Sequence, residues 1–276
     1  MLREWLRVCF VSSGSLFGVY IALGLLMGRI EALNAYFIGG TLGRIGMIIT
    51  GFIGTVVHEF SHFLMCLVFR HKVVEVAWFR PIQGMQDGVL GYVRHQYNPE
   101  DWYQQIGNFF IGIAPLLVGS VVILLLFKIF LPNISSNFTS TMNRNIQQMN
   151  QVFSVGSILK LMGKQTKCLF KGLFTKENMT KPIFWVFLFS VYSISTHMSL
   201  SLADLRGAAV GLVFMIGFIM VLSAVLTVLH IPLKKLAPVM VRYNSWVITI
   251  FSIGLSFSLL TLGISGIGFL IFGINR

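Results

Sequence analysis

The sequence predicts an all-α polytopic membrane protein with about six transmembrane helices and a small membrane-associated β-hairpin after the second helix. Three observations predict this fold: 55% of the 276 residues are hydrophobic, only 11% are charged, and the apolar residues gather in long runs. Soluble domains carry about 25% charged residues, so this chain lacks the polar surface needed to cover itself in water. We expect one membrane-embedded domain over residues 1–276. Its compactness and lack of soluble domains point to the bacterial cytoplasmic membrane.

A membrane-spanning helix needs about 20 apolar residues, and the expected helices follow from that length. They cover about residues 8–28, 45–69 and 105–131, two stretches within 182–231 that meet near 201–207, and 243–273. The first is long enough to span, so a retained helix is expected rather than a cleaved signal peptide. A turn is expected at 28–36, and glycines at 39, 40, 43 and 46 are expected to bend the start of the next run.

The net charge of +12 points to the lipid bilayer as a partner and not to nucleic acid. In membrane proteins, Lys and Arg gather in the segments that flank the spans and contact anionic headgroups. Residues 133–182 are polar and basic, and this basic loop is expected to be cytoplasmic. Six spans would then place the hairpin and both termini on the opposite side.

The segment 72–97 has the composition of a β-hairpin. The runs Val73–Phe79 and Val89–Val93 are rich in β-branched and aromatic residues, and the segment between them contains Pro81 and three further turn-forming residues. This pattern is typical of two strands joined by a loop of several residues. His71 and His95 flank the hairpin and are expected to be polar loop residues.

The sequence His58-Glu59-Phe60-Ser61-His62 carries the strongest chemical signal in the chain. Residues i and i+4 share one face of a helix, so His58 and His62 can direct two imidazoles at one zinc ion. Glu59 can accept a proton from a water at that ion. Ionisable residues inside a membrane span are costly and usually functional, and a shared metal would explain three of them within five positions.

Catalytic zinc sites typically have three protein ligands and one open position. Asp204 is the expected third ligand, and His197 is its rival. His197, Ser201 and Asp204 are spaced i, i+4, i+7, so they would share one face if the segment were helical. Asp204 could instead pair with Arg206 or cap a helix where two spans meet, and His197 could be a polar packing contact.

Asn108, near the start of the third span, is a candidate donor to a developing oxyanion or to a substrate backbone. The alternative role is to cap the helix or to satisfy its backbone. His197 is a second candidate substrate contact. Cys9 and Cys66 lie in apolar runs, where cysteine behaves as a small hydrophobe.

These residues resemble the site-two protease family of intramembrane zinc metalloproteases, as a divergent member. The resemblance covers about residues 45–210 and rests on three features: the His58–His62 motif in an early span, the hairpin that follows it, and Asp204 in a later span. It implies a Zn²⁺ cofactor, a transmembrane protein or peptide as substrate, and a hairpin that helps hold the unwound substrate. Asp204 is followed by Leu205, where the family usually has glycine.

The expected activity is that of a zinc metalloendopeptidase, and three alternatives stay open. The same polar groups could form a proton or metal path in a transporter or channel. The chain could be a non-catalytic membrane protein that binds metal, or that binds a partner through residues 133–182. It could also be a metalloprotease that acts on soluble peptides at the membrane surface.

Overall fold

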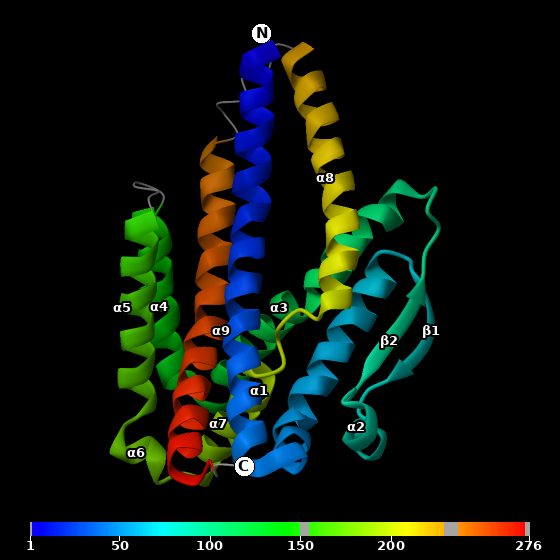
Figure 1. Cartoon of the computed structure of the whole chain (residues 1–276). Helices are drawn as coiled ribbons and strands as arrows, with labels where there is room; N and C mark the ends of the chain where they lie inside the picture. Colours follow the sequence, from blue (N-terminus) through cyan, green and yellow to red (C-terminus); the bar gives the residue numbers. More distant parts are fainter. Residues whose placement is uncertain (1, 150–154, 229–236, 274–276) are drawn as a thin grey trace.

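The computed structural model describes residues 2–149, 155–228 and 237–273, and most of them are helical (Figure 1). A two-stranded sheet interrupts the helices between α1 and α3. The elements in chain order are α1 Leu2–Val68, β1 Lys72–Ala77, α2 Pro81–Asp87, β2 Tyr92–Gln96, α3 Trp102–Phe130, α4 Pro132–Met149, α5 Val155–Leu173, α6 Lys176–Met179, α7 Pro182–Ser195, α8 Leu202–Val228 and α9 Ala237–Phe272.

A sharp kink at Gly43 divides α1 into two limbs. Gly43 has φ 63° and ψ −155°, a conformation that glycine adopts readily and side-chain-bearing residues rarely do. Figure 1 shows the N-terminal limb descending to the kink and the limb over 44–68 returning beside it. The bend predicted in the glycine-rich segment is therefore present.

The turn expected at residues 28–36 is absent, and that prediction was wrong. Residues 29–36 contain neither Gly nor Pro and include the good helix formers Glu31, Ala32 and Leu33, so the helix continues through them. Asn34 is buried there and donates a hydrogen bond from Nδ2 to Thr261 Oγ1 on α9, at 3.2 Å. The N-terminal limb is thus fixed against α9.

Four helices within the described residues are long and apolar enough to cross a membrane. They lie at Ile21–Val68, Trp102–Phe130, Leu202–Val225 and Phe251–Phe272. The apolar helix α7 has 14 residues, which at 1.5 Å per residue reach about 21 Å, less than the hydrocarbon thickness of about 30 Å. A helical membrane protein is supported, and the number of six crossings stays a prediction.

The apolar stretch 182–231 divides into α7 and α8, as predicted, but at residues 196–201. The break therefore comes a few residues before the expected position. His197 and Ser201 lie in this connection and not on a helix, so the predicted common face of His197, Ser201 and Asp204 does not exist.

The basic segment 133–182 is mainly helical over its described part and not a loop, in contrast to the prediction. It contains most of α4, all of α5 and α6, and the start of α7. Along α5, Lys160, Lys164, Lys167 and Lys171 are exposed at spacings of four, three and four residues, while Leu169 and Leu173 are buried. This is the period of an amphipathic helix.

Helix α3 lies at the centre of the fold, between α1, α7, α8 and α9 (Figure 1). Its buried residues include Leu116, Ile123 and Phe127, which join a core with Phe187 of α7 and Phe257 of α9. Because α3 contacts helices from both ends of the chain, it can supply backbone and side-chain groups to a site shared by several of them.

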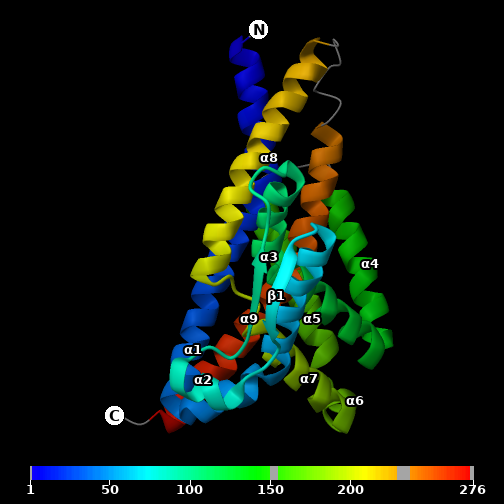
Figure 2. The ribbon, with the colours of Figure 1, turned by 90° about the vertical axis from the view of Figure 1, so that its right-hand side faces the viewer.

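The two strands form an antiparallel pair in which Val76 lies opposite Val93 and Ala77 opposite Tyr92. The two predicted strands therefore pair, joined by a short helix, α2, in place of an irregular loop, and the association of this hairpin with a membrane stays a prediction. Figure 2 shows the hairpin beside the C-terminal limb of α1. Trp78 packs on Phe63 of that limb, with ring centroids 5.4 Å apart, so the hairpin is anchored to the helix that carries the His58–His62 motif.

Candidate metal centre

His58 and His62 lie one turn apart on α1, and their Nε2 atoms approach to 3.1 Å. Asp204, in the first turn of α8, places Oδ1 3.3 Å from His62 Nε2 and Oδ2 3.8 Å from His58 Nε2. One donor atom from each of the three residues lies within 4.8 Å of the other two. The predicted ligand set is therefore brought together by two helices far apart in sequence.

Backbone carbonyls orient both imidazoles. His58 Nδ1 lies 2.7 Å from the His197 carbonyl oxygen, and His62 Nδ1 lies 2.9 Å from that of Ile111. A neutral imidazole carries one N–H, and a carbonyl can only accept, so Nδ1 donates in each ring. The Nε2 lone pairs then face each other and Asp204, which is the arrangement typical of metal-binding histidines.

Asp204 has a second role as part of the N-terminal cap of α8. Its Oδ2 accepts from the Ser201 backbone N–H at 2.8 Å, and its own N–H donates to Ser201 Oγ at 3.1 Å. This reciprocal pair is a capping box. The cap and the ligand role that the sequence left as alternatives are thus compatible, because the two carboxylate oxygens remain close to the imidazoles.

Close packing of α3 on α8 brings Asp204 to the histidines. A Cβ added at Gly112 of α3 would lie 2.5 Å from the Asp204 carbonyl oxygen and 2.7 Å from Ala208 Cβ. Only glycine allows the two helices to approach this closely, as at other small-residue helix contacts in membranes.

Replacement of Gly112 by Ala is expected to weaken the binding of added Zn²⁺ at the candidate group of His58, His62 and Asp204 by roughly 10-fold or more, because the helices must separate and carry Asp204 away. Gly217→Ala, on α8 where an added Cβ meets nothing within 4 Å, is the matched control and should bind zinc normally. Titration with a competing chelator measures both. Equal affinities in the two variants would contradict this account of the packing.

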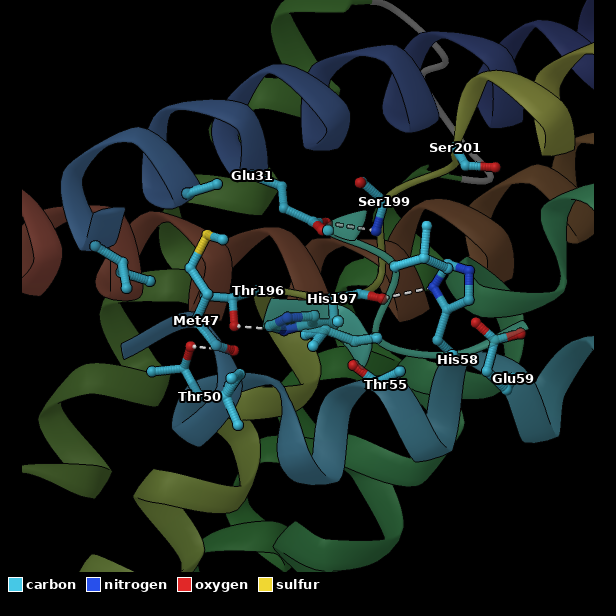
Figure 3. Close-up of a pocket in the computed structure, with 18 of the residues that line it drawn as sticks. Glu31, Met47, Thr50, Thr55, His58, Glu59, Thr196, His197, Ser199 and Ser201 are labelled. Carbon is cyan, nitrogen blue, oxygen red and sulfur yellow. Dashed lines mark hydrogen bonds between the residues drawn. The ribbon is translucent and has the colours of Figure 1, made fainter. Parts of the chain in front are cut away.

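Glu59 is buried, with 7% of its surface exposed, and it lines two cavities beside His58, of which Figure 3 shows the first. The first cavity, of about 370 Å³, lies between the two limbs of α1, the segment leading into β2 and the 196–201 connection. The second, of about 460 Å³, also contains His62, Asp204 and Asn108. The carboxylate thus lies where space for a ligand meets the three donor groups.

Gly91, just before β2, allows the hairpin to lie against Glu59. A Cβ at this position would lie 2.8 Å from Glu59 Cγ and 2.8 Å from Thr55 Cγ2. The residues from Val89 to Val93 line one or both of the cavities. The hairpin therefore forms a wall of the candidate site.

His197 does not join the ligand group. Its backbone carbonyl holds His58, whereas its ring Nδ1 lies 3.1 Å from the Ser193 carbonyl oxygen and the side chain lines the first cavity (Figure 3). Among the described residues, Asp204 is the acid that completes the group with the two histidines.

Asn108 lies on α3, with 5% of its surface exposed, and lines the second cavity. None of the described residues hydrogen-bonds its Nδ2. A buried amide without a partner costs free energy, so a donor kept free beside the candidate metal ligands suits a contact with a bound ligand.

Two features of this region were missed in the sequence. Glu31, on the N-terminal limb of α1, lines the first cavity, and its Oε2 accepts from the Ser199 N–H at 2.6 Å (Figure 3). The presence of a carboxylate within an apolar run could have indicated that Glu31 lies at a functional site.

His71, expected to be a polar loop residue, is only 4% exposed and forms a group with Cys66 and His95. Burial lowers the pKa of both His71 and His95.

Comparisons of the chain with protein-family models, with curated proteins and with solved structures gave no match.

Proposed function

We propose that this protein is an intramembrane zinc metalloendopeptidase that hydrolyses a peptide bond in or near the transmembrane segment of a membrane protein or peptide. The observation that carries the proposal is the convergence of His58 Nε2, His62 Nε2 and the Asp204 carboxylate beside Glu59. This group lies on helices apolar enough to span a bilayer. Divergent membership of the site-two protease family and a location in the bacterial cytoplasmic membrane are parts of the same proposal.

The donor set fits zinc. Two imidazole nitrogens and one carboxylate are ligands that Zn²⁺ accepts, and three protein ligands leave one position open. Nitrogen donors of a tetrahedral zinc site, with bonds of 2.0–2.1 Å, lie about 3.3 Å apart, close to the 3.1 Å between the two Nε2 atoms. A bound Zn²⁺ would lower the pKa of a water molecule and polarise the scissile carbonyl.

Glu59 is assigned as the general base and then the general acid. Its place beside His58 on the wall of both cavities would let it take the proton of the attacking water and return it to the leaving amine. Asn108 Nδ2, buried and free of partners among the described residues, would donate to the oxyanion that develops on the substrate carbonyl.

The segment 89–93 is assigned to substrate binding. A helical substrate hides its carbonyls in its own hydrogen bonds and must unwind before hydrolysis. Over the described residues the sheet contains only β1 and β2, so one edge of β2 has no neighbouring strand and could pair with an extended substrate. Such pairing would offset the cost of unwinding.

Replacement of Gly91 by Ala is expected to slow cleavage by roughly 10-fold or more while zinc remains bound, because the new methyl group displaces Glu59 or the hairpin. Gly28→Ala is the control, since an added Cβ there meets nothing within 4 Å. Initial rates and zinc content of the purified variants test this. If the Gly91→Ala variant cleaved as fast as Gly28→Ala, the hairpin would not form a functional wall of the site.

The function itself is tested by comparing membranes from cells that express the wild type or Glu59→Gln. New peptide termini inside transmembrane segments, present only with the wild type, are expected. Termini confined to soluble segments would favour a surface protease instead. Altered ion or proton flux without any new termini would contradict the protease assignment and favour a transporter.

A further inference from the structure

A second group of metal-binding side chains lies next to the proposed centre. Donor atoms of Cys66, His71 and His95 all lie within 4.8 Å of one another. Cys66 follows His62 by four residues, so it lies on the same face of α1, one turn and about 6 Å further along the helix axis. This group has no residue in common with the group formed by His58, His62 and Asp204.

The end of α1 folds back to assemble this group. The His71 N–H donates to the Cys66 carbonyl at 2.8 Å, and the Arg70 N–H donates to that of Leu67 at 3.3 Å. Arg70 adopts φ 59°, the left-handed conformation of a Schellman turn, although it is not glycine. His71 is thereby returned over the last turn of the helix that carries Cys66.

The hairpin supplies the third side chain. In the register of the sheet, Lys72 lies opposite Gln96 and Val73 opposite His95, so the residue next to His71 pairs with the residue next to His95. The two imidazoles meet with their Nδ1 atoms 3.0 Å apart. The helix end therefore positions His71, and the strand pairing brings His95 to it.

His71 is oriented as a metal ligand. Its Nε2 lies 2.9 Å from the Gln104 carbonyl oxygen, so Nε2 carries the hydrogen and Nδ1 presents a lone pair. Metal-bound histidines characteristically donate their other N–H to such a carbonyl. The same pattern holds for His58 and His62, with Nδ1 on a carbonyl and Nε2 on the partner ring. An increase of a few tenths of an ångström in the distance between the His71 and His95 Nδ1 atoms would match a tetrahedral site.

We propose that Cys66, His71 and His95 form a second metal site, which binds a thiophilic d¹⁰ cation of the Zn²⁺ type. One thiolate and two imidazoles suit such a cation. Binding transfers the Cys66 thiol proton to solvent as the sulfur–metal bond forms. His95 also lines the cavity of the first centre, so one side of the proposed site adjoins that cavity. The ion would fasten the hairpin to the end of α1.

Co²⁺ is the probe, because a bond between cobalt and a thiolate gives a charge-transfer band in the near ultraviolet and the first centre contains no sulfur. The full chain, with Cys9→Ser and Cys168→Ser so that Cys66 is its one cysteine, is stripped of metal in detergent and given about two equivalents of Co²⁺. The band is expected, and it should persist when Asp204→Ala is added. Its absence from this chain, or its loss with Asp204→Ala, would overturn the proposal.

Cys66→Ser in the same background should abolish the band and reduce the bound metal by about one ion per chain. Thermal unfolding shows whether the variant is folded: without metal, the Cys66→Ser chain should have the same melting temperature as its parent. Co²⁺ should then raise the melting temperature of the Asp204→Ala chain but not of a chain carrying both substitutions. Equal metal content with and without Cys66, or an equal Co²⁺ shift in these two chains, would reduce the group to a hydrogen-bonded histidine pair beside an inert thiol.

Discussion

Replacement of Glu59 by Gln is expected to slow cleavage by roughly 10²–10⁴-fold and to leave zinc bound, because the amide has the shape of the carboxylate but cannot accept a proton. Glu59 lies beside His58 on the wall of both cavities and is not one of the three grouped donors. Its loss should therefore remove proton transfer without removing the metal. Initial rates on a substrate found in the membrane comparison, together with zinc content, measure the two effects separately.

Glu177→Gln is the matched control, since Glu177 is an exposed carboxylate on α6 paired with Lys181. This variant should cleave at the wild-type rate. Full activity of the Glu59→Gln variant would exclude Glu59 as the general base, and loss of both activity and zinc would show a structural role instead.

Asp204→Ala and His197→Ala are expected to behave differently. Asp204 places both carboxylate oxygens within 3.8 Å of the imidazoles, so its removal should weaken zinc binding by more than about 100-fold, beyond the usual cost of losing an outer hydrogen-bond partner. His197 holds His58 through its backbone carbonyl, which alanine keeps. Competition with a zinc chelator compares the two affinities.

Asp204→Asn refines this comparison, because it preserves the hydrogen bonds to Ser201 in part while removing the charge. An intermediate affinity would separate the ligand role from the helix cap. The opposite order, with zinc lost in His197→Ala and retained in Asp204→Ala, would make His197 the third ligand and would require the 196–201 connection to rearrange.

Local rules account for the parts of the fold and site that the sequence predicted. His58 and His62 share a helical face because their spacing is set by the helix itself. The hairpin follows from β-branched runs separated by turn residues, and the bend in α1 falls at a glycine with positive φ. Each of these features depends on residues that are neighbours in the chain.

Tertiary contacts account for the parts that the sequence did not predict. The carbonyls of Ile111 and His197 orient the histidines, and a backbone carbonyl has no sequence signature. The pairing of His71 with His95 depends on the register of the two strands. The length of the 182–231 stretch predicted a helix break, but residues 196–201 contain neither Gly nor Pro, so composition did not show that the break would take His197 out of the helix.

Zinc content of the purified protein tests the central claim most directly. Elemental analysis of wild type and His62→Ala, both prepared with zinc supplied and without chelators, should show a difference of about one ion per chain. That difference would place a metal at the group formed by His58, His62 and Asp204. Equal zinc content in the two proteins, or none in either, would contradict the metalloprotease account.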